Sequence, residues 1–364
     1  MNRRDRRALK EFDDKIGRAE RVLDDLFVYV NAFTNNSGFD FEPDSVRFFL
    51  DGLDVPDDTP FEDKPKRTIE SLMKRLDAID AIGKDNDLFT ERCLDYYGIK
   101  EPTEEEIECA ESELRDRLNE NERPKSGAMV DSRGVITRIR KNLSVYPKLL
   151  DIWDVVEEEA SKGGSEVCVN KSQMAVIVRD DYNRCEERAN VTAVHEVLGH
   201  IYRWSSGLGQ EPLSNTYFCG AGRKWMTEEG VANWVSDQLC DRSREPPFYP
   251  AYFIAGAERL KGAKKSEIEE KMLEYGMEKE DAEKVARRVS RGLKDPEKEG
   301  CCPKDIIYFR GKRAIQEYLD SGGSLRNLYV GAVALEEMEQ VERFLREGIL
   351  RPAKYVPDIV VQDR

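Results

Sequence analysis

Both histidines of this 364-residue chain lie in one hexapeptide, and no other feature constrains the local backbone as strongly. The segment runs from His195 to His200 and reads HEVLGH. Histidines with unrelated structural roles would not be expected to lie so close together. Neutral imidazoles are strong zinc ligands, and a carboxylate beside the first ligand can hold and deprotonate the water that completes the site. The hexapeptide therefore indicates a zinc site with Glu196 as the general base.

The spacing of the two histidines predicts an irregular helix. Residues five apart lie about 140° apart around an α-helix, against about 40° for the four-residue spacing of zincin-type HExxH motifs. Two side chains on such different faces cannot easily share one ion. We therefore expect the backbone to widen into a π-turn or to break at Gly199, because π-bulges commonly lie at functional sites. The alternative, two histidines on different faces of a surface helix, stays open from the spacing alone.

A second helical segment downstream offers a third ligand. Catalytic zinc sites commonly have three protein ligands and a water. The segment from Trp225 to Trp234 carries the pair Glu228 and Glu229 close behind an aromatic cluster. Acids in a first helical turn are also favoured by the helix dipole, but two histidines that lack a partner favour the ligand interpretation. Either glutamate fits this pattern.

Apolar residues recur at helical spacing through most of the chain, whereas one segment alternates as a strand does. The front third is predicted to be all helical, with a turn-rich stretch at 35–65. Residues 163–181, rich in Val and Ile, predict two short strands on either side of Asn170-Lys171. Helices are expected at residues 3–30, 67–82, 87–97, 103–120, 187–207, 228–240, 264–292 as a pair, 312–320 and 335–347. The predicted fold class is α+β, predominantly α-helical, with a small β-sheet preceding the active-site helix.

Composition indicates a globular chain and narrows its partners. Hydrophobic residues make up 39% of the sequence and charged residues 36%, which suits a packed core with solvated helix faces. A formal net charge of -15 argues against nucleic-acid binding, which needs clustered basic residues. No stretch approaches the roughly 18 apolar residues of a membrane span, and no secretory signal is present. Eight cysteines without a CxxC pair suit free thiols, so we expect a cytoplasmic protein with no membrane partner.

These motifs together resemble a family of HExxxH metallopeptidases that includes the microtubule-associated tyrosine carboxypeptidases and microbial proteins named for a QEGLA motif. The family's HExxxH segment, NG..QP-like segment and TQEGLA-like helix are similar to HEVLGH, residues 206–213 and residues 227–232. An R..RG segment and a KD..Y..G segment resemble residues 288–292 and 304–311. The resemblance extends over most of the chain, most closely over 187–357. Glu228 stands where the motif has Gln.

The resemblance implies a zincin-like metallopeptidase core, with an N-terminal helical region over residues 1–125 and a catalytic domain over 126–364. It implies a zinc metallocarboxypeptidase with one Zn²⁺ per chain. The substrate would be the C-terminus of a peptide or protein, from which tyrosine or another aromatic residue is removed. Aligning the glycine of the TQEGLA-like motif assigns the third metal ligand to Glu229, beside His195 and His200.

The implied activity also needs residues that bind the substrate. A carboxypeptidase requires a cation for the terminal carboxylate and a donor for the oxyanion. Arg288, Arg291 and Arg310 are candidates for the first task and Tyr308 for the second, although each arginine could equally form a structural ion pair. The strand expected at 173–179 could pair with an extended substrate backbone if its edge is exposed.

Two alternatives from other classes stay open. The chain could be a non-catalytic zinc-binding regulatory protein, in which case a fourth protein ligand such as Cys219 would close the site. It could also be a zinc hydrolase that acts on a small molecule, in which case a narrow pocket would replace a groove for an extended chain.

Overall fold

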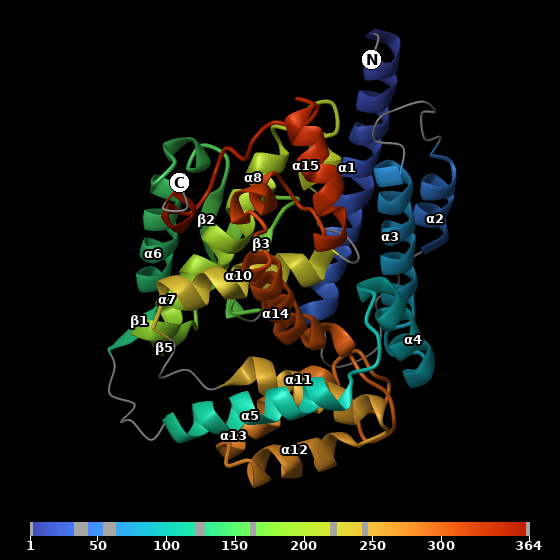
Figure 1. Ribbon diagram of the computed structural model, residues 1–364. Helices are drawn as coiled ribbons and strands as arrows, with labels where there is room; N and C mark the ends of the chain where they lie inside the picture. Colours follow the sequence, from blue (N-terminus) through green and yellow to red (C-terminus); the bar gives the residue numbers. More distant parts are fainter. Residues whose placement is uncertain are drawn as a thin grey trace.

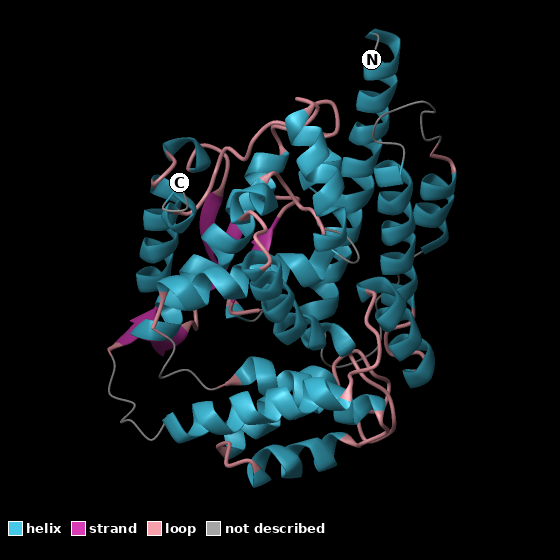
Figure 2. Ribbon diagram, viewed as in Figure 1, coloured by secondary structure: helices cyan, strands magenta, loops and turns pink. Residues whose placement is uncertain are grey.

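Helices make up most of the chain, and two small sheets lie among them (Figures 1 and 2). This computed structural model describes residues 3–32, 43–53, 63–120, 128–160, 165–218, 224–241 and 247–361. The predominance of helix with small sheets agrees with the predicted α+β class, whereas the zincin-like core stays a prediction. None of the described helices combines the length and the apolarity that a membrane crossing needs.

The described residues of the first third of the chain form helices joined by turns, as their apolar periodicity predicts. The helices are α1 (Arg3–Ala32), α2 (Pro43–Asp51), α3 (Asp63–Asp80), α4 (Asn86–Tyr97) and α5 (Glu104–Glu120). The N-terminus of α5 has a capping box. Thr103 Oγ1 accepts a hydrogen bond from the backbone N–H of Glu106, and the Glu106 carboxylate accepts one from the N–H of Thr103. These two bonds satisfy N–H groups that have no partner within the helix.

The expected turn-rich stretch at 35–65 is wrong in part, because its middle forms α2. Pro43 begins this helix and Asp44 follows it, a combination that favours a helix start. Residues 35–42 and 54–62 of the same stretch lie outside the described residues.

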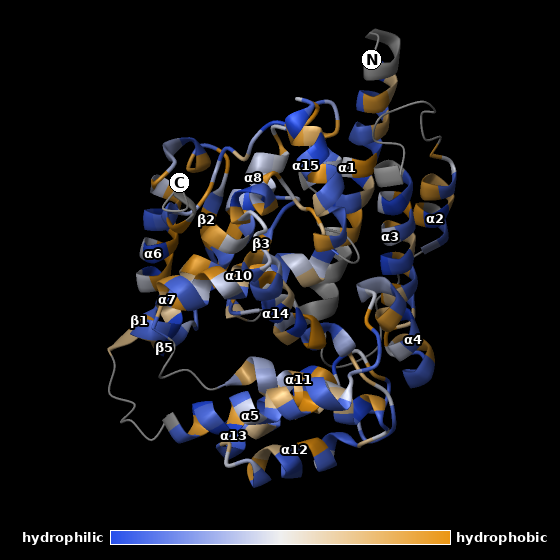
Figure 3. Ribbon diagram, in the orientation of Figure 1, coloured by the Kyte–Doolittle hydropathy of each residue, from blue (hydrophilic) through white to orange (hydrophobic). Residues whose placement is uncertain are grey.

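The front helices contribute to different apolar clusters. Residues of α1, α2 and α3 share one cluster, which includes Ile16, Leu72 and Leu76. In contrast, α5 packs beside α11 (Phe248–Leu260), α12 (Lys265–Glu274) and α13 (Lys279–Val289). These four helices form the lower layer in Figure 1, and Figure 3 shows apolar residues along α11. The predicted domain boundary at 125/126 falls in residues 121–127, outside the described part of the chain.

Three strands form the larger sheet, in the order β2 (Asp154–Glu158), β4 (Ala175–Arg179), β3 (Val167–Asn170). β3 and β4 are antiparallel, as the two Val-rich runs predict, whereas the parallel partner β2 was not predicted. Because β4 is the central strand, both of its edges are occupied. The expectation that residues 173–179 offer an edge to a substrate is therefore wrong. A second sheet pairs β1 (Met129–Asp131) with β5 (Asn183–Cys185).

A continuous helical segment follows β5 and passes through the middle of the molecule (Figure 1). It consists of α7 (Glu186–Val194), the π-helix η3 (His195–Ile201) and α8 (Tyr202–Gly207). The helix α10 (Lys224–Leu239) contacts both η3 and α14 (Ile306–Asp320). The 3-10 turn η4 (Pro303–Asp305) leads directly into α14. The helix α10 thus contacts two segments that are distant from it in sequence, η3 and α14.

The remaining elements lie around the larger sheet and the C-terminal part of the chain. They are α6 (Ser132–Ser144), η1 (Pro147–Leu149), α9 (Ser214–Phe218), η5 (Leu325–Tyr329), η6 (Leu335–Glu337), α15 (Met338–Arg346) and α16 (Asp358–Val361). Apolar residues from the sheet, η3 and α15 form one cluster, which includes Val176, Val197 and Phe344. The core beneath η3 therefore joins the sheet to the C-terminal helices.

Candidate metal centre

The hexapeptide lies in a π-helix, so the predicted irregularity is confirmed. Each N–H in a π-helix donates to the carbonyl five residues earlier, and the N–H of Tyr202 donates to the carbonyl of Val197 in this way. Residues five apart therefore become neighbours on one face. The Nε2 atoms of His195 and His200 are 3.2 Å apart. Of the two expected irregularities, the structure has the widened turn and not a break at Gly199.

Glycines allow the backbone of α10 to approach the backbones of both η3 and α14 closely. A Cβ on Gly199 would lie 2.4 Å from the Cβ of Ala232 and 2.6 Å from its Cα. A Cβ on Gly230 would lie 2.4 Å from the carbonyl oxygen of Gly311 in α14. Because Gly199 has no side chain, α10 approaches η3 closely enough for Glu229 to reach the two imidazoles.

The structure brings His195, His200 and Glu229 together. One potential ligand atom from each residue lies within 4.8 Å of the other two. Glu229 Oε2 is 3.3 Å from His195 Nε2 and 3.6 Å from His200 Nε2. This carboxylate oxygen is buried but makes no hydrogen bond, and neither does the buried Nδ1 of His195. Buried polar atoms without partners are costly, so the donor set and its unmet bonding capacity both fit a zinc ion.

Within the described residues, this cluster has three members, which leaves a coordination position for water as in catalytic zinc sites. Cys219, which would close the site in a regulatory protein, lies outside the described residues. Glu196 is half-buried and follows the first histidine, where a general base would be placed.

The pKa values of the two carboxyl groups Glu229 and Glu196 are shifted in opposite directions. Burial alone would raise the pKa of Glu229, but its contacts with His195 and His200 outweigh burial and hold that pKa well below its usual value. Burial raises the pKa of Glu196, and the nearby imidazoles offset this only in part. A ligand that stays ionised and a base that holds a proton more readily are suited to different roles.

Glu228, the other glutamate of the pair, points to the back of His200. Its Oε1 lies 3.2 Å from His200 Nδ1, and its Oε2 accepts a 2.7 Å hydrogen bond from Arg203. Arg203 is fully buried and also donates to the carbonyl oxygens of Leu328 and Val333. A carboxylate on the distal nitrogen orients a metal-binding histidine and fixes its tautomer. This geometry distinguishes the two glutamates, which sequence reasoning from the residues alone left equivalent.

Aromatic and cationic side chains that the sequence analysis did not single out surround the histidines. Trp204 stacks on His200 with ring centroids 5.1 Å apart and an angle of 16° between the planes. Lys171, in the β3–β4 turn, lies 5.0 Å from the Trp204 ring and 3.2 Å from the buried Glu20 of α1. In the sequence, these side chains were indicated only by a lysine at the expected turn and by tryptophans close to the two motifs.

Tyr308 lies in the first turn of α14, near enough to Glu229 for the charge of that carboxylate to influence it. It is 7% exposed, and its ring stacks on Tyr249 with centroids 5.4 Å apart. Burial first, and then the charge of Glu229, raise its pKa well above the usual value. The phenol therefore stays protonated and can donate a hydrogen bond at neutral pH.

Two of the three predicted arginines share one carboxylate close to Tyr308. Arg288 and Arg291 contact the two oxygens of Asp305, at 3.0 Å and 3.2 Å. The Arg288 guanidinium also lies 5.6 Å from the Tyr308 ring. Because two guanidinium groups share one carboxylate, this group of three residues carries a net positive charge.

The third predicted arginine, Arg310, occupies a different place. Both of its contacts with the Glu106 carboxylate are 2.7 Å long. It also donates to the backbone carbonyls of Lys100 and Glu101. Arg310 thus joins α14 to the start of α5, and the structure does not bring it together with Arg288 and Arg291.

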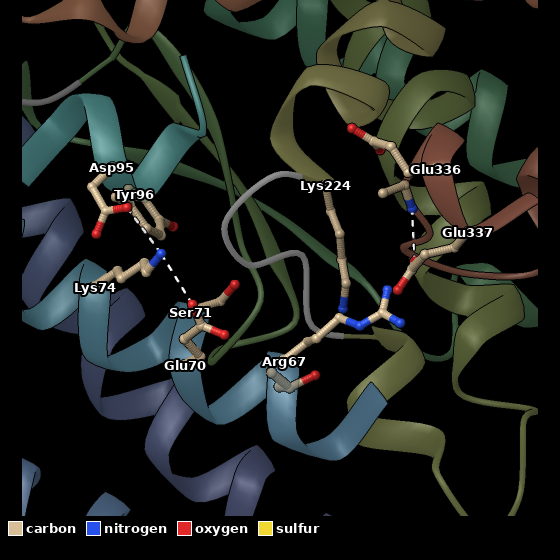
Figure 4. A pocket seen from close by; sticks show the side chains of 11 residues that line it. Arg67, Glu70, Ser71, Lys74, Asp95, Tyr96, Lys224, Glu336 and Glu337 are labelled. Carbon is tan, nitrogen blue, oxygen red and sulfur yellow. Dashed lines mark hydrogen bonds and ion pairs between the residues drawn. The ribbon is translucent and has the colours of Figure 1, made fainter. Parts of the chain in front are cut away.

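A cavity of about 220 Å³ lies between α3, α4, the start of α10 and η6 (Figure 4). Figure 4 shows Arg67, Lys224 and Glu337 on one side of it and Lys74 with Asp95 on the other. Its lining carries both signs of charge. Tyr96, which also lines it, accepts a 2.8 Å hydrogen bond from Trp225, one turn before Glu229. The cavity therefore adjoins the start of the helix that also carries Glu229.

Comparison with known proteins connects the site to a family. Residues 31–364 match the family model described as microtubule-associated tyrosine carboxypeptidase. The match covers nearly the whole chain and includes every residue of the cluster. A search of curated proteins found no match.

Proposed function

The chain belongs to the microtubule-associated tyrosine carboxypeptidase family, and we propose that it is a zinc metallocarboxypeptidase that removes a C-terminal tyrosine or other aromatic residue. Family membership implies tyrosine carboxypeptidase activity in general, with the C-terminus of a peptide or protein as substrate. The observation that carries the zinc-dependent mechanism is the convergence of His195, His200 and Glu229 within 4.8 Å. The π-helix makes this convergence possible for two histidines five residues apart.

Zinc held by these three residues would polarise the scissile carbonyl and make the attacking water more acidic. Glu196 takes a proton from that water as its oxygen attacks the carbonyl carbon. When the C–N bond breaks, Glu196 delivers the same proton to the leaving amine. The products are the shortened chain and a free amino acid. The raised pKa of Glu196 supports this double role, since a base that must also return the proton as an acid benefits from a pKa above the usual carboxylate value.

Neighbouring side chains would bind and orient the substrate. The neutral hydroxyl of Tyr308 is suited to donate a hydrogen bond to the oxyanion. Arg288 and Arg291, with their shared Asp305, carry a net positive charge that would attract the terminal carboxylate of the substrate. The stacked rings of Tyr249 and Tyr308 present aromatic surface beside the reacting bond, which suits an aromatic leaving residue.

The first test combines metal content with peptide cleavage. We expect the purified protein to contain about one equivalent of zinc, and His195→Ala to lose it, because two remaining ligands bind weakly. The wild type should release single C-terminal residues, with preference for aromatic ones, from a panel of peptides that differ only in the last residue. Glu196→Gln should retain its zinc and lose about 100-fold or more in kcat, because it removes a general base and not a ligand. Full activity of Glu196→Gln would contradict this mechanism.

A further inference from the structure

Lys171 lies in the turn between β3 and β4, and its ammonium group contacts two indole rings. Its Nζ atom is 5.0 Å from the centre of the Trp204 ring and 5.8 Å from the centre of the Trp225 ring. The residue is buried, with 6% of its surface exposed. Contacts between a cation and an aromatic face are stronger when water is excluded from the cation. Lys171 therefore connects two aromatic side chains that belong to different helical segments.

Each of these tryptophans lies about one helical turn from a proposed metal ligand. Trp204 follows His200 by four residues, and the two rings stack with centroids 5.1 Å apart and an angle of 16° between the planes. Trp225 precedes Glu229 by four residues in α10, so the two side chains lie on the same face of that helix. One indole thus follows the segment that carries the histidines, and the other belongs to the helix that carries the carboxylate.

A buried carboxylate from the first helix holds the ammonium group in this position. Glu20 of α1 is 2% exposed, and its Oε1 atom lies 3.2 Å from Nζ of Lys171. The same oxygen lies 3.7 Å from Nη1 of the buried Arg75 in α3. Breaking a buried ion pair is costly, because the charge that remains has lost its compensation. The ion pair therefore fixes Lys171 relative to α1.

The net charge of this group argues that its role is positional. Lys171, Arg75 and Glu20 together carry one net positive charge, which repels a divalent cation. If Lys171 acted on the zinc ion by charge alone, it would weaken zinc binding. The contacts with the two indoles act in the opposite direction, because they restrain the segments from which His200 and Glu229 reach the ion.

We propose that Glu20 and Lys171 are positioning residues of the metal centre, and this inference rests on the proposed zinc-dependent function. Lys171 sets the separation of the two tryptophans, and with it the separation of His200 from Glu229. Glu20 supplies the carboxylate that keeps the ammonium group against both indoles. The helix α1 thus contributes to zinc affinity, although none of its described residues belongs to the three-residue cluster.

The test measures zinc affinity by competition with a chromophoric chelator and does not depend on turnover. A positional role and a purely electrostatic role predict opposite signs for Lys171→Met. Loss of the contacts that orient the ligands should lower zinc affinity about 10-fold. Loss of a nearby positive charge alone would raise zinc affinity.

Two further changes test whether the ion pair acts as a unit. Lys171→Arg should stay within a few-fold of the wild-type zinc affinity, because a guanidinium group also pairs with carboxylates and stacks on aromatic rings. Glu20→Gln should lower zinc affinity about as much as Lys171→Met does. The double variant should bind zinc no more weakly than either single variant, because residues in direct contact are not additive.

A second buried acid of α1 provides a matched control. Asp13 is 2% exposed and accepts hydrogen bonds from the backbone N–H groups of Asn215 and Thr216 in α9, at 2.7 Å and 2.8 Å. Asp13→Asn should therefore lower the melting temperature, as Glu20→Gln does, but should retain the wild-type zinc affinity. Near-ultraviolet circular dichroism of chelator-treated protein gives a readout without metal, since it reports fixed packing of aromatic rings. This spectrum should change in Lys171→Met and not in Asp13→Asn.

Several results would overturn the proposal. They are an unchanged or increased zinc affinity of Lys171→Met, the wild-type zinc affinity in Glu20→Gln, or an equal loss of zinc affinity in Asp13→Asn. Failure of the proposed function is a separate result, in which the wild type binds no zinc. The spectra of the chelator-treated variants would then still decide whether Lys171 holds the two indoles, and an unchanged spectrum of Lys171→Met would exclude it.

Discussion

Glu228 lies directly behind the three residues of the proposed metal centre and is not one of its ligands. It accepts a hydrogen bond from Arg203, contacts His200 Nδ1, and is itself fully buried. Arg203 supplies a full positive charge, so the buried glutamate is compensated although the family motif has Gln at this position. Pairs of this kind are costly to break, because one charge is then left buried without a partner.

Replacement of Glu228 should therefore separate two effects. Glu228→Ala removes the partner of His200, and we expect zinc affinity to fall about 10- to 100-fold in competition with a chromophoric chelator. Glu228→Gln keeps an acceptor for the imidazole, so its zinc affinity should stay within a few-fold of the wild type. Both variants should melt at lower temperature because Arg203 loses its counter-charge. Equal zinc affinity of Glu228→Ala and the wild type would remove the orienting role.

His200 should make the stability of the metal-free protein depend on pH. Burial opposes its charged form, but contacts with Glu228 and Glu229 raise its pKa from 6.5 to about 10. A raised folded-state pKa stabilises the fold fully below the unfolded value, and this stabilisation is lost as pH rises through the folded value. We expect the Tm of chelator-treated protein to fall from about pH 6.5 to about pH 10. The zinc-loaded protein should vary less, since the imidazole binds metal in its neutral form. Parallel Tm curves for the two forms would contradict this account.

At the scale of elements, the contact between η3 and α10 sets the geometry of the centre. The π-helix places two histidines on one face, but Glu229 reaches them only because Gly199 lets Ala232 approach so closely. A substituent at this position would push the two helices apart, because both neighbouring atoms belong to or lie next to a helix backbone.

Gly199→Ala is therefore expected to weaken zinc binding and destabilise the fold together. The added Cβ would lie 2.4 Å and 2.6 Å from two atoms of Ala232, and overpacking of this kind commonly costs about 1–3 kcal/mol. The readouts are the midpoint of urea unfolding and the zinc content after dialysis. Gly52→Ala is a suitable control, because its nearest atom would be 3.4 Å away. Wild-type zinc affinity in Gly199→Ala would show that the approach of the helices is not needed.

At the scale of the whole molecule, the layer of α5 and α11–α13 is tied to the helix that carries Tyr308. Arg310 makes this connection through Glu106, with the backbone of residues 100 and 101 as further acceptors. The pair is only partly exposed, so it is more protected from solvent than a surface ion pair. The Arg310–Glu106 pair thereby holds α14 against the start of α5, although the two helices are far apart in sequence.

We expect Arg310→Met to lower stability by about 1–3 kcal/mol, as loss of charge-assisted hydrogen bonds does, while the aliphatic stem is preserved. Zinc content should stay at the wild-type value. The affinities for two peptides of one sequence, one with a free C-terminal carboxylate and one with a C-terminal carboxamide, should also keep their wild-type ratio. Glu106→Gln is the matched change from the other side and should give a similar loss in urea unfolding. A selective loss of affinity for the free-acid peptide in Arg310→Met would assign Arg310 to the substrate instead.

Local patterns were enough to predict most of the long helices, the hairpin and the irregularity of the histidine helix, but not the helices α2, α6 and α11. Periodicity and capping depend on residues a few positions apart, so the capping box of α5 and the β3–β4 pair follow from sequence. An irregular helix follows in the same way, because two ligands at a spacing of five cannot share an ion on a regular α-helix, but the choice between a π-turn and a break at Gly199 came from the structure. The residues that sequence named as metal ligands do lie together, and zinc binding itself stays a prediction.

Other features were decided only by tertiary structure, because they depend on contacts between distant segments. The parallel pairing with β2 placed β4 in the centre of its sheet, and no local signal indicates this. Arg203 and His200 meet Glu228 only when α10 packs against η3. The two histidines five residues apart determined the chemistry that this chain can support. The approach of α10 determined which carboxylate completes the centre, since only the packed helices set which side chain can reach two imidazoles.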